Sequence, residues 1–361
     1  MNLRIPGPTP LPPEVREALQ TQMINHRGRV FGQIIGEVTE GLKHFFQTEN
    51  DLLILTGSGT GVMEAAIVNT LSPGEKVLSV SIGNFGDRFA SMAAKFGVDV
   101  TKLQIPAGHA AQADAVAQAL DADPGITTVL VTHNETSTGT TNPLESIARV
   151  VKQRGKLLIV DGISSVGSID LKTDEWGCDV VLSGSQKGWM VPPGLAFASV
   201  SPFAWERHAQ AKLPRVYWDF SDAKRYLEHG ETPWTPAVSI FFGLQVALRM
   251  MREEGREEIF ARHGRVAQRC RDRAVEMGLK LFADPHHASN TVTAFYTPEG
   301  MDSRPLANML EDEYDTVIAL GQGAYTNTSL RIGHLGWVDE HDIDLTMDSL
   351  EKVLSRATAK G

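Results

Sequence analysis

The most distinctive reactive residue of the sequence is a lysine between two apolar runs, in Ser183-Gly-Ser-Gln-Lys-Gly188. A lysine amine held in a dry pocket has a lowered pKa, and it can then form a Schiff base with a carbonyl compound. The alternative is a lysine on a solvated loop, which is the commoner fate of this residue type. The small residues around Lys187 are unusual for a surface loop, and both interpretations stay open at this point.

A turn rich in glycine and hydroxyl residues, Thr56-Gly-Ser-Gly-Thr-Gly61, follows an apolar run and precedes a helix-length segment. Such glycines let the backbone approach a ligand, and the free N–H groups of a helix start attract phosphate. Val62 stands where a dinucleotide fingerprint has its third glycine, and no Gly-Lys-Ser/Thr of a P-loop follows. A tight turn without a ligand is the alternative, but the composition favours a site for one phosphate.

An aspartate ends the apolar run Leu157-Leu-Ile-Val-Asp161. A charge at the end of a buried strand is costly unless it is paired, and ligands of open α/β sheets bind at the carboxyl ends of strands. Asp161-Gly162 is also a turn signal, so a turn or N-cap aspartate is equally compatible with the pattern.

An arginine lies within a strand-like run in Leu330-Arg-Ile-Gly-His334. Inside a cleft, its planar guanidinium would bind a carboxylate through two parallel hydrogen bonds. An arginine of an edge strand is the alternative. The polar segment 132–139 follows another apolar run, and its His133 is expected to be structural, because no second ligand stands at metal-binding spacing.

Composition excludes several broad classes. The 361 residues contain 34 lysines and arginines against 44 aspartates and glutamates, a net charge of −10, which disfavours a generic nucleic-acid surface. Cys178 and Cys270 are far apart and form no CxxC motif, so neither a disulfide framework nor a cysteine-rich zinc site is expected. No apolar signal core follows residues 1–10, and charges and prolines interrupt the most apolar stretch, so we expect a cytoplasmic protein.

Short apolar runs alternate with helical patterns through the first two-thirds of the chain, which predicts βαβ units and a mostly parallel sheet. The expected strands are Leu52–Thr56, Lys76–Ser81, Val100–Ile105, Thr128–Thr132, Lys156–Val160, Val180–Leu182 and Leu195–Val200. The expected helices between them are Gly61–Leu71, Asp87–Phe96, Ala110–Leu120 and Pro143–Arg154, the last with Asn142 as its cap. The last two strands are too close for a helical crossover, so we expect an antiparallel hairpin that carries Lys187 at the edge of the sheet.

The pattern changes after about residue 201 and predicts a small α+β domain at the C-terminal end. A helix is expected from Ser239 to about Glu253, at the end of the large domain. The expected elements of the small domain are helices at Arg256–Met277, Pro305–Glu313 and about Glu340–Thr358, with strands at Thr291–Tyr296 and Ser329–Ile332. We therefore expect an N-terminal segment (1–20), a large domain (21–254) and a small domain (255–361).

A phosphate turn, a strand-end aspartate and a reactive lysine together resemble the pyridoxal 5′-phosphate (PLP) site of the fold-type I class V aminotransferases. The resemblance is strongest to the alanine–glyoxylate and serine–glyoxylate aminotransferases, and it spans Pro6-Gly-Pro-Thr9 to Arg331-Ile-Gly333. Its most specific motifs are Ser183–Lys187 followed by Pro192-Pro-Gly194, and Thr232–Pro236 ahead of a long helix. It implies a seven-stranded, mostly parallel sheet in the large domain.

The resemblance also implies a role for each site residue. Lys187 would form the Schiff base with PLP and move protons as base and acid, while Asp161 would keep the pyridine nitrogen protonated. Arg331 would bind the substrate α-carboxylate, with Gly7 of the N-terminal loop close by. The other implied cofactor contacts are Ser58, Gly59, Thr60 and Gln186 at the phosphate, Thr136 near the phenolic oxygen, and Phe85 and Ile163 on the two ring faces. Family members often carry tryptophan at the position of Phe85.

Thr235, and with it Thr232, would reach the phosphate of a neighbouring subunit, which implies a homodimer with shared sites. The single arginine candidate points to a small monocarboxylate amino donor, alanine or serine, with glyoxylate or pyruvate as acceptor. A second cation from His26 or Arg27 would instead admit a dicarboxylate or a phosphonate, although packing is the slightly favoured role of these two residues.

Several alternatives share the scaffold. An aminotransferase for 2-aminoethylphosphonate and pyruvate, and enzymes acting on a ureido-amino acid or on pyridoxamine, stay open. A cysteine desulfurase is disfavoured because segment 321–328 has no cysteine. A non-catalytic homologue would be expected to lose Lys187 or Asp161, and the glycine spacing disfavours a nicotinamide dehydrogenase.

Overall fold

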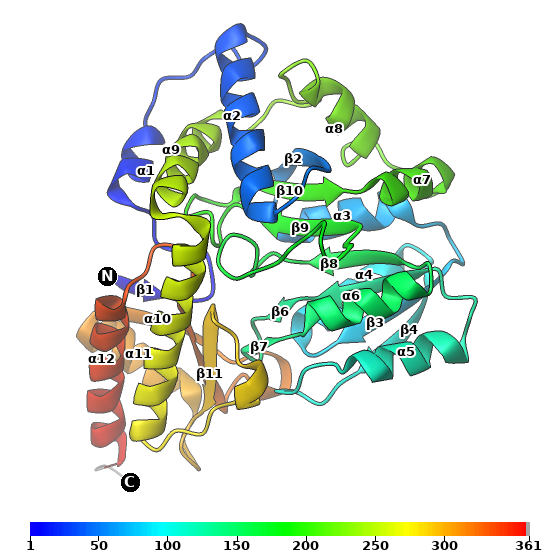
Figure 1. Ribbon diagram of the computed structural model, residues 1–361. Coiled ribbons are helices and arrows are strands. Elements are labelled where there is room, and N and C mark those ends of the chain that lie inside the picture. Colours follow the sequence, from blue (N-terminus) through cyan, green and yellow to red (C-terminus); the bar gives the residue numbers. More distant parts are fainter. Residues whose placement is uncertain (359–361) are drawn as a thin grey trace.

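The computed structural model describes residues 1–358 and has a seven-stranded sheet at its centre (Figure 1). The strand order is β2 (Asp51–Gly57), β10 (Gly194–Val200), β9 (Val180–Gly184), β8 (Leu157–Asp161), β5 (Thr128–Thr132), β3 (Lys76–Ser81) and β4 (Asp99–Gln104). Each expected strand is present, with its ends shifted by at most two residues. β10 alone runs in the direction opposite to the other six strands of this sheet, so the mostly parallel sheet is confirmed.

The hairpin of β9 and β10 is antiparallel, as the short connection predicts. Its expected position at the sheet edge is wrong, because β2 pairs with the outer side of β10. The short connection between β9 and β10 predicts how these two strands pair with each other. It gives no information about which strand pairs with the outer side of β10. The pairing of Gly57 with Gly194 places the glycine turn after β2 beside the start of β10, and therefore beside the loop that carries Lys187.

Helices cover both faces of this sheet. One face carries α3 (Gly59–Thr70), α4 (Asn84–Lys95), α7 (Pro202–Gln210) and α8 (Phe220–Leu227). The other face carries α2 (Arg29–Phe46), α5 (Ala113–Ala122), α6 (Leu144–Gln153) and α9 (Val238–Glu254). The short helix α1 (Pro13–Ala18) packs on α9. Figure 1 shows α5 and α6 in front of the sheet and α3 behind it. Two buried apolar clusters fill the spaces between the sheet and these layers.

Two helix starts differ from expectation because of one buried asparagine. Asn142 does not cap α6, whose cap position is taken by Pro143 without a side-chain bond. The Asn142 side chain instead accepts from the N–H of Ala111 (2.8 Å) and donates to the carbonyl of Thr132 (2.9 Å). These bonds satisfy backbone groups that would otherwise be buried without partners, and they hold Ala111 outside α5, which begins at Ala113.

A second sheet lies at the other end of the molecule. Its order is β1 (Asn2–Arg4), β12 (Thr316–Leu320), β13 (Ser329–Gly333) and β11 (Val292–Tyr296), and it packs with α10 (Arg256–Glu276), α11 (Ser303–Tyr314) and α12 (Glu340–Thr358). The β1 strand was not expected from the sequence, and its parallel pairing with β12 ties residues 2–4 to this sheet. The boundaries at residues 20 and 254 remain our proposal for the division of the chain.

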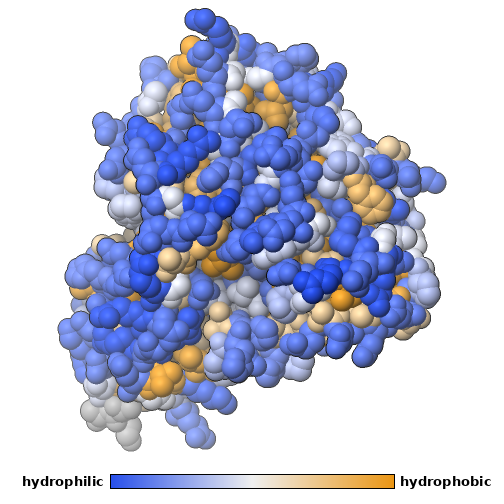
Figure 2. All heavy atoms as spheres, in the orientation of Figure 1, coloured by the Kyte–Doolittle hydropathy of each residue, from blue (hydrophilic) through white to orange (hydrophobic). Residues whose placement is uncertain are grey.

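The outer faces of the helices are polar, and Figure 2 shows a mainly hydrophilic surface on this side of the molecule. Within residues 1–358, no helix combines the length and the apolar character needed to cross a membrane. The remaining short elements are the ribbon of β6 (Asn134–Glu135) and β7 (Thr140–Thr141) and two 3-10 turns at Pro285–His287 and Gly323–Tyr325.

Candidate active site

The predicted site residues gather at the carboxyl ends of the parallel strands. Asp161 ends β8, and the segments carrying Ser58, Phe85, Thr136 and Lys187 directly follow β2, β3, β5 and β9. Carboxyl ends of parallel strands meet at one edge of a sheet, which explains how residues far apart in sequence converge. Arg331 comes from β13 of the smaller sheet and reaches the same edge, where it contacts Thr136.

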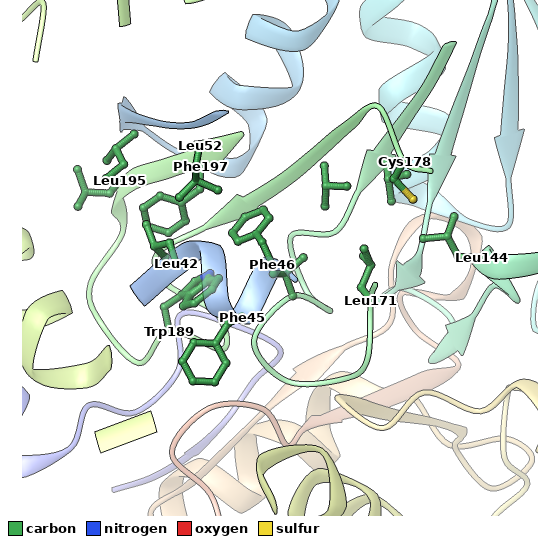
Figure 3. Close-up of a cluster of buried hydrophobic side chains, with 14 of the residues drawn as sticks. Leu42, Phe45, Phe46, Leu52, Leu144, Leu171, Cys178, Trp189, Leu195 and Phe197 are labelled. Carbon is green, nitrogen blue, oxygen red and sulfur yellow. The ribbon is translucent and has the colours of Figure 1, made fainter. Parts of the chain in front are cut away.

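Lys187 is held in place by a tryptophan two residues later. Trp189 is fully buried, and its indole N–H donates to the hydroxyl of Ser183 (2.8 Å). Its ring stacks on Phe46 with centroids 5.8 Å apart (Figure 3). An aromatic anchor of this size fixes the loop conformation, so the backbone of Lys187 is set before any ligand binds. Sequence reasoning did not single out Trp189.

The amine of Lys187 points to the N-terminal segment. Its Nζ donates to the carbonyl oxygen of Pro6 (2.5 Å), and Thr9 donates through its hydroxyl to the Lys187 carbonyl (3.0 Å). A Cβ on Gly7 would lie 2.7 Å from Nζ, and Gly7 has φ +130°, so only glycine fits this position beside the lysine. Burial, and to a lesser extent the charge of Arg331, lower the pKa of Lys187 to about 8, while the charge of Asp161 opposes this shift.

Asp161 is buried and only partly satisfied. One carboxylate oxygen accepts from the backbone N–H of Ile163 (3.0 Å), and the other has only a long contact from the Thr132 hydroxyl (3.4 Å). Burial, and to a lesser extent the charge of Glu135, raise the pKa of Asp161 to about 6, while the Ile163 bond and the charge of Lys187 oppose this rise. Its oxygen can therefore accept from a positively charged N–H group, which is the partner that a protonated pyridine nitrogen supplies.

The turn after β2 forms an open cradle at the start of α3. The hydroxyl of Ser58 caps the helix by accepting from the N–H of Gly61 (3.4 Å), while the N–H groups of Gly59 and Thr60 have no acceptor within residues 1–358. A Cβ on Gly59 would lie 2.7 Å from Ile163, so the turn after β8 packs directly against the cradle. These unpaired donors at a helix start fit a phosphate group.

Gln186 lies close to the same cradle. A Cβ on Gly184 would approach both the amide oxygen of Gln186 (3.1 Å) and the backbone of Gly59 (3.5 Å). That amide oxygen is buried and has no donor within residues 1–358, and the NH₂ group of the same amide is the part that could donate to a phosphate. The expected phosphate contacts Ser58, Gly59, Thr60 and Gln186 are thus brought together, and Ile163 lies beside them.

Arg331 is buried, and two of its nitrogens are held by backbone carbonyls. Nε donates to Leu320 (2.8 Å) and Nη1 to Thr136 (3.0 Å), while Nη2 has no acceptor within residues 1–358. Burial lowers its pKa to about 10, so it keeps its charge at neutral pH. The guanidinium is oriented by the protein and retains unpaired N–H groups, which suit a carboxylate.

Phe85 lies in the first turn of α4, half-buried, with the Arg88 guanidinium 4.8 Å from its ring centre. This helix was expected to begin at Asp87, and its earlier start at Asn84 gives Phe85 a fixed helical backbone. Thr136 is buried, and its carbonyl binds Arg331.

Two pairs of expected residues lie outside this cluster in the same chain. The hydroxyl of Thr232 donates to the carbonyl of Trp234 (2.7 Å), and Thr235 is exposed. Arg27 pairs with Glu231, and its guanidinium lies 5.5 Å from the ring centre of Tyr226. Half-buried His26 precedes it in the same loop. Within residues 1–358, no hydrogen bond or ion pair joins these residues to Lys187 or Asp161.

The chain is similar to known proteins over almost its whole length. The model of the family Aminotransferase class-V matches residues 1–334. A protein of Synechococcus sp. named as the small subunit of a soluble hydrogenase is 43% identical, covering 98% of this chain and 92% of its own. The L-aspartate–glyoxylate aminotransferase of Paracoccus denitrificans is 41% identical, covering 92% of this chain and 85% of its own.

Among solved structures, alanine–glyoxylate aminotransferase from Nostoc sp. has a TM-score of 0.94 at 29% identity, covering 98% of this chain and 94% of that one. The fold, the strand-end cluster around Lys187 and the family match agree with one another. The chain belongs to the class V aminotransferase family.

Proposed function

We propose that the chain is a PLP-dependent aminotransferase that moves the amino group of alanine or serine to glyoxylate or pyruvate. The observation that carries the proposal is the meeting of a largely buried lysine amine with a buried carboxylate at the strand ends, where each perturbs the pKa of the other. The cradle at Gly59 and Thr60 supplies the phosphate site that such a cofactor requires.

PLP, when bound, supplies a ring that accepts the electron pair released when the Cα–H bond of an amino acid breaks. The residues of the chain do the rest. Asp161 accepts a hydrogen bond from the ring nitrogen and holds the proton there. Lys187 would take the proton from Cα of the amino acid and deliver it to the former aldehyde carbon of the cofactor, on the other side of the amino nitrogen. Arg331 would fix the substrate carboxylate so that the Cα–H bond faces the amine.

Arg331, the arginine candidate of the cluster, supports an amino donor that has a single carboxylate. Arg331 is the buried arginine that keeps free N–H groups at this edge of the sheet. The similarity to an alanine–glyoxylate aminotransferase supports the same donor and acceptor classes.

Aspartate is the second candidate donor, because a relative at 41% identity is named for aspartate and glyoxylate. A second carboxylate would need a second cation. Arg27 lies beside Glu231, which immediately precedes the Thr232–Thr235 loop, and this loop is the part of the chain that we expect at a neighbouring subunit's site.

We propose that the chain forms a homodimer in which this loop reaches the site of the other subunit. The proposal is supported by an exposed aromatic pair at the loop, Tyr217 stacked on Trp234 with ring centroids 5.8 Å apart.

A panel of amino donors tests the function. Alanine, serine, aspartate, 2-aminoethylphosphonate and pyridoxamine are each incubated with PLP-loaded protein and either glyoxylate or pyruvate, and the amino product is quantified. Preference for alanine or serine supports the first candidate, and preference for aspartate supports the second. Hydrogen uptake with a dye acceptor, measured on the same preparation, tests the activity for which the Synechococcus relative is named. Absence of every amino product would contradict the proposal.

The lowered pKa of Lys187 predicts how fast apoprotein captures PLP at different pH. Only the uncharged amine reacts with the aldehyde, and with a pKa of about 8 roughly a tenth of it is uncharged at pH 7. The capture rate should therefore rise with pH up to about 8 and then level off. Stopped-flow absorbance with excess PLP measures this rate. A rate that keeps rising to the ordinary lysine pKa of 10.5 would contradict the environment described for Lys187.

Replacing Arg331 with alanine should lower kcat/KM for alanine or serine roughly 10- to 100-fold, because a charge-assisted bond to the carboxylate is lost. Arg331→Lys keeps the charge but not the fork, and it should recover only part of this loss. The control substrate is a simple amine without a carboxylate, whose slow reaction should hardly change. An equal loss for both substrates would show that Arg331 supports the fold rather than the carboxylate.

A further inference from the structure

A buried glutamate that was not among the expected site residues lies next to the active-site cluster. Glu135 is completely buried, and each of its oxygens accepts two hydrogen bonds. Oε2 accepts from the backbone N–H groups of Phe85 (2.9 Å) and Gly86 (3.2 Å). Oε1 accepts from the backbone N–H (3.0 Å) and the hydroxyl (2.6 Å) of Ser137.

These partners favour the ionised form of the side chain. Three of them are backbone N–H groups, which can only donate, and the fourth is the Ser137 hydroxyl. Burial raises the pKa of Glu135 above its ordinary value, and the hydrogen bonds from Ser137, Gly86 and Phe85 oppose this rise. The carboxylate also lies at the positive end of the α4 dipole, which stabilises negative charge. The buried charge is therefore compensated by the elements that it joins.

Glu135 and Ser137 together hold the first turn of α4. The Ser137 hydroxyl accepts from the N–H of Asn84 (3.0 Å), so three successive N–H groups of the helix start are bound by the loop after β5. Gly83 makes the close approach possible, because a Cβ there would lie 2.6 Å from both Glu135 and Ser137. The helix start cannot shift without breaking bonds of a buried carboxylate.

The same loop also holds Arg331. The carbonyl of Thr136, between Glu135 and Ser137, accepts from Nη1 of Arg331 (3.0 Å), and the charge of Glu135 raises the pKa of that guanidinium. One buried side chain thus connects the ring expected to stack on the cofactor, Phe85, with the arginine expected to bind the substrate.

We propose that Glu135 is a positioning residue of the aminotransferase site, which fixes the Phe85 ring against the cofactor by clamping the first turn of α4 to the loop after β5. This inference rests on the proposed function. It goes beyond that function in assigning a task to a residue that touches neither the substrate nor PLP.

The first test is Glu135→Gln, which keeps the size of the side chain but places an NH₂ group opposite donors. The PLP dissociation constant should rise about tenfold or more, which corresponds to ~1.4 kcal/mol. The visible circular dichroism of bound PLP should also weaken, because the ring loses its fixed neighbour. The matched control is Glu145→Gln on α6, where an exposed carboxylate pairs only with Arg149, and both readouts should be unchanged.

A double-mutant cycle with Phe85→Leu separates positioning from general destabilisation. If Glu135 acts through Phe85, Glu135→Gln should change the dissociation constant by less than about threefold once the ring is gone. Gly83→Ala is a second route to the same effect, because its Cβ would clash with the side chains of Glu135 and Ser137 and so separate the helix start from them, while the charge of Glu135 is kept. Should Glu135→Gln fail to fold, the cycle is run with Gly83→Ala.

The outcomes separate this inference from the proposed function. Wild-type protein that binds PLP, with an unchanged dissociation constant and dichroism in Glu135→Gln, would overturn the positioning role alone. A tenfold loss that persists unchanged in the Phe85→Leu background would overturn it as well. Wild-type protein that binds no PLP would overturn the proposed function, and the positioning role with it.

Discussion

Replacing Lys187 with alanine is expected to leave a folded protein that no longer transaminates. The variant lacks both the covalent attachment of the cofactor and the amine that moves the proton, so turnover should fall by more than about 10³-fold. The fold should persist, because Trp189 and its bond to Ser183 anchor the loop independently of the lysine side chain. Steady-state rates with the best donor of the panel, together with thermal unfolding, measure both effects.

The control for this variant is Lys172→Ala, which removes a half-buried surface lysine whose side chain pairs with Glu175. Its rate should equal that of the wild type. The Lys187→Ala protein can still bind PLP noncovalently through the cradle at Gly59 and Thr60, so loss of turnover should not require loss of the cofactor. Full activity of Lys187→Ala would end the proposed mechanism.

Replacing Asp161 with alanine is expected to lower turnover by about 100-fold or more, equivalent to about 2.7 kcal/mol of activation free energy. Without the carboxylate, the ring nitrogen of bound PLP loses its proton more easily, and the negative charge that develops as the Cα–H bond breaks is less stabilised. The site is buried, so water cannot replace the missing charge effectively. Rates are measured at saturating PLP, so that weaker binding does not contribute.

Two further variants are compared with Asp161→Ala. Asp161→Asn keeps the size and can accept a hydrogen bond but carries no charge, so its rate should also be low. Asp114→Ala removes an exposed aspartate from the first turn of α5 and should leave the rate unchanged. Near-normal turnover in Asp161→Ala at saturating PLP would show that this carboxylate is not the partner of the ring nitrogen.

The sequence predicted which strands and turns carry the site residues better than it predicted how the strands pair in the sheet. The alternation of short apolar runs with helical segments identifies the strands, and turns at their carboxyl ends then place Asp161 and the Ser58–Thr60 turn at one edge. Local spacing also identifies the β9–β10 hairpin. It cannot identify the outer neighbour of that hairpin, because β2 lies more than a hundred residues earlier in the chain.

The errors at helix starts have a common physical origin. A cap residue such as Asn142 is recognised from its type, but its side chain is used instead by distant backbone groups at Ala111 and Thr132. In the same way, α4 begins before the first turn expected from the pattern, because Glu135 and Ser137 supply acceptors for its N–H groups. Such partners are created by the tertiary fold, and no local pattern shows them.

Residues that support the site were missed for a related reason. Trp189 reads as one more apolar residue, and only its stacking on Phe46 reveals that it anchors the lysine loop. The carbonyl of Pro6 is a backbone group without a side-chain signal, although Gly7 next to it was expected near the site. Glu135 lay inside a polar segment whose importance was visible, but its direction toward α4 was not.

The proposed function requires a covalent bond between the amine of Lys187 and the aldehyde carbon of PLP, and hydride trapping detects this bond. Protein loaded with excess PLP is reduced with borohydride, digested and examined by peptide mass spectrometry. We predict a pyridoxyl-phosphate group on the peptide that contains Lys187, and its absence from the same peptide when alanine occupies this position. A protein that carries no such group at residue 187 after loading and reduction would contradict the account.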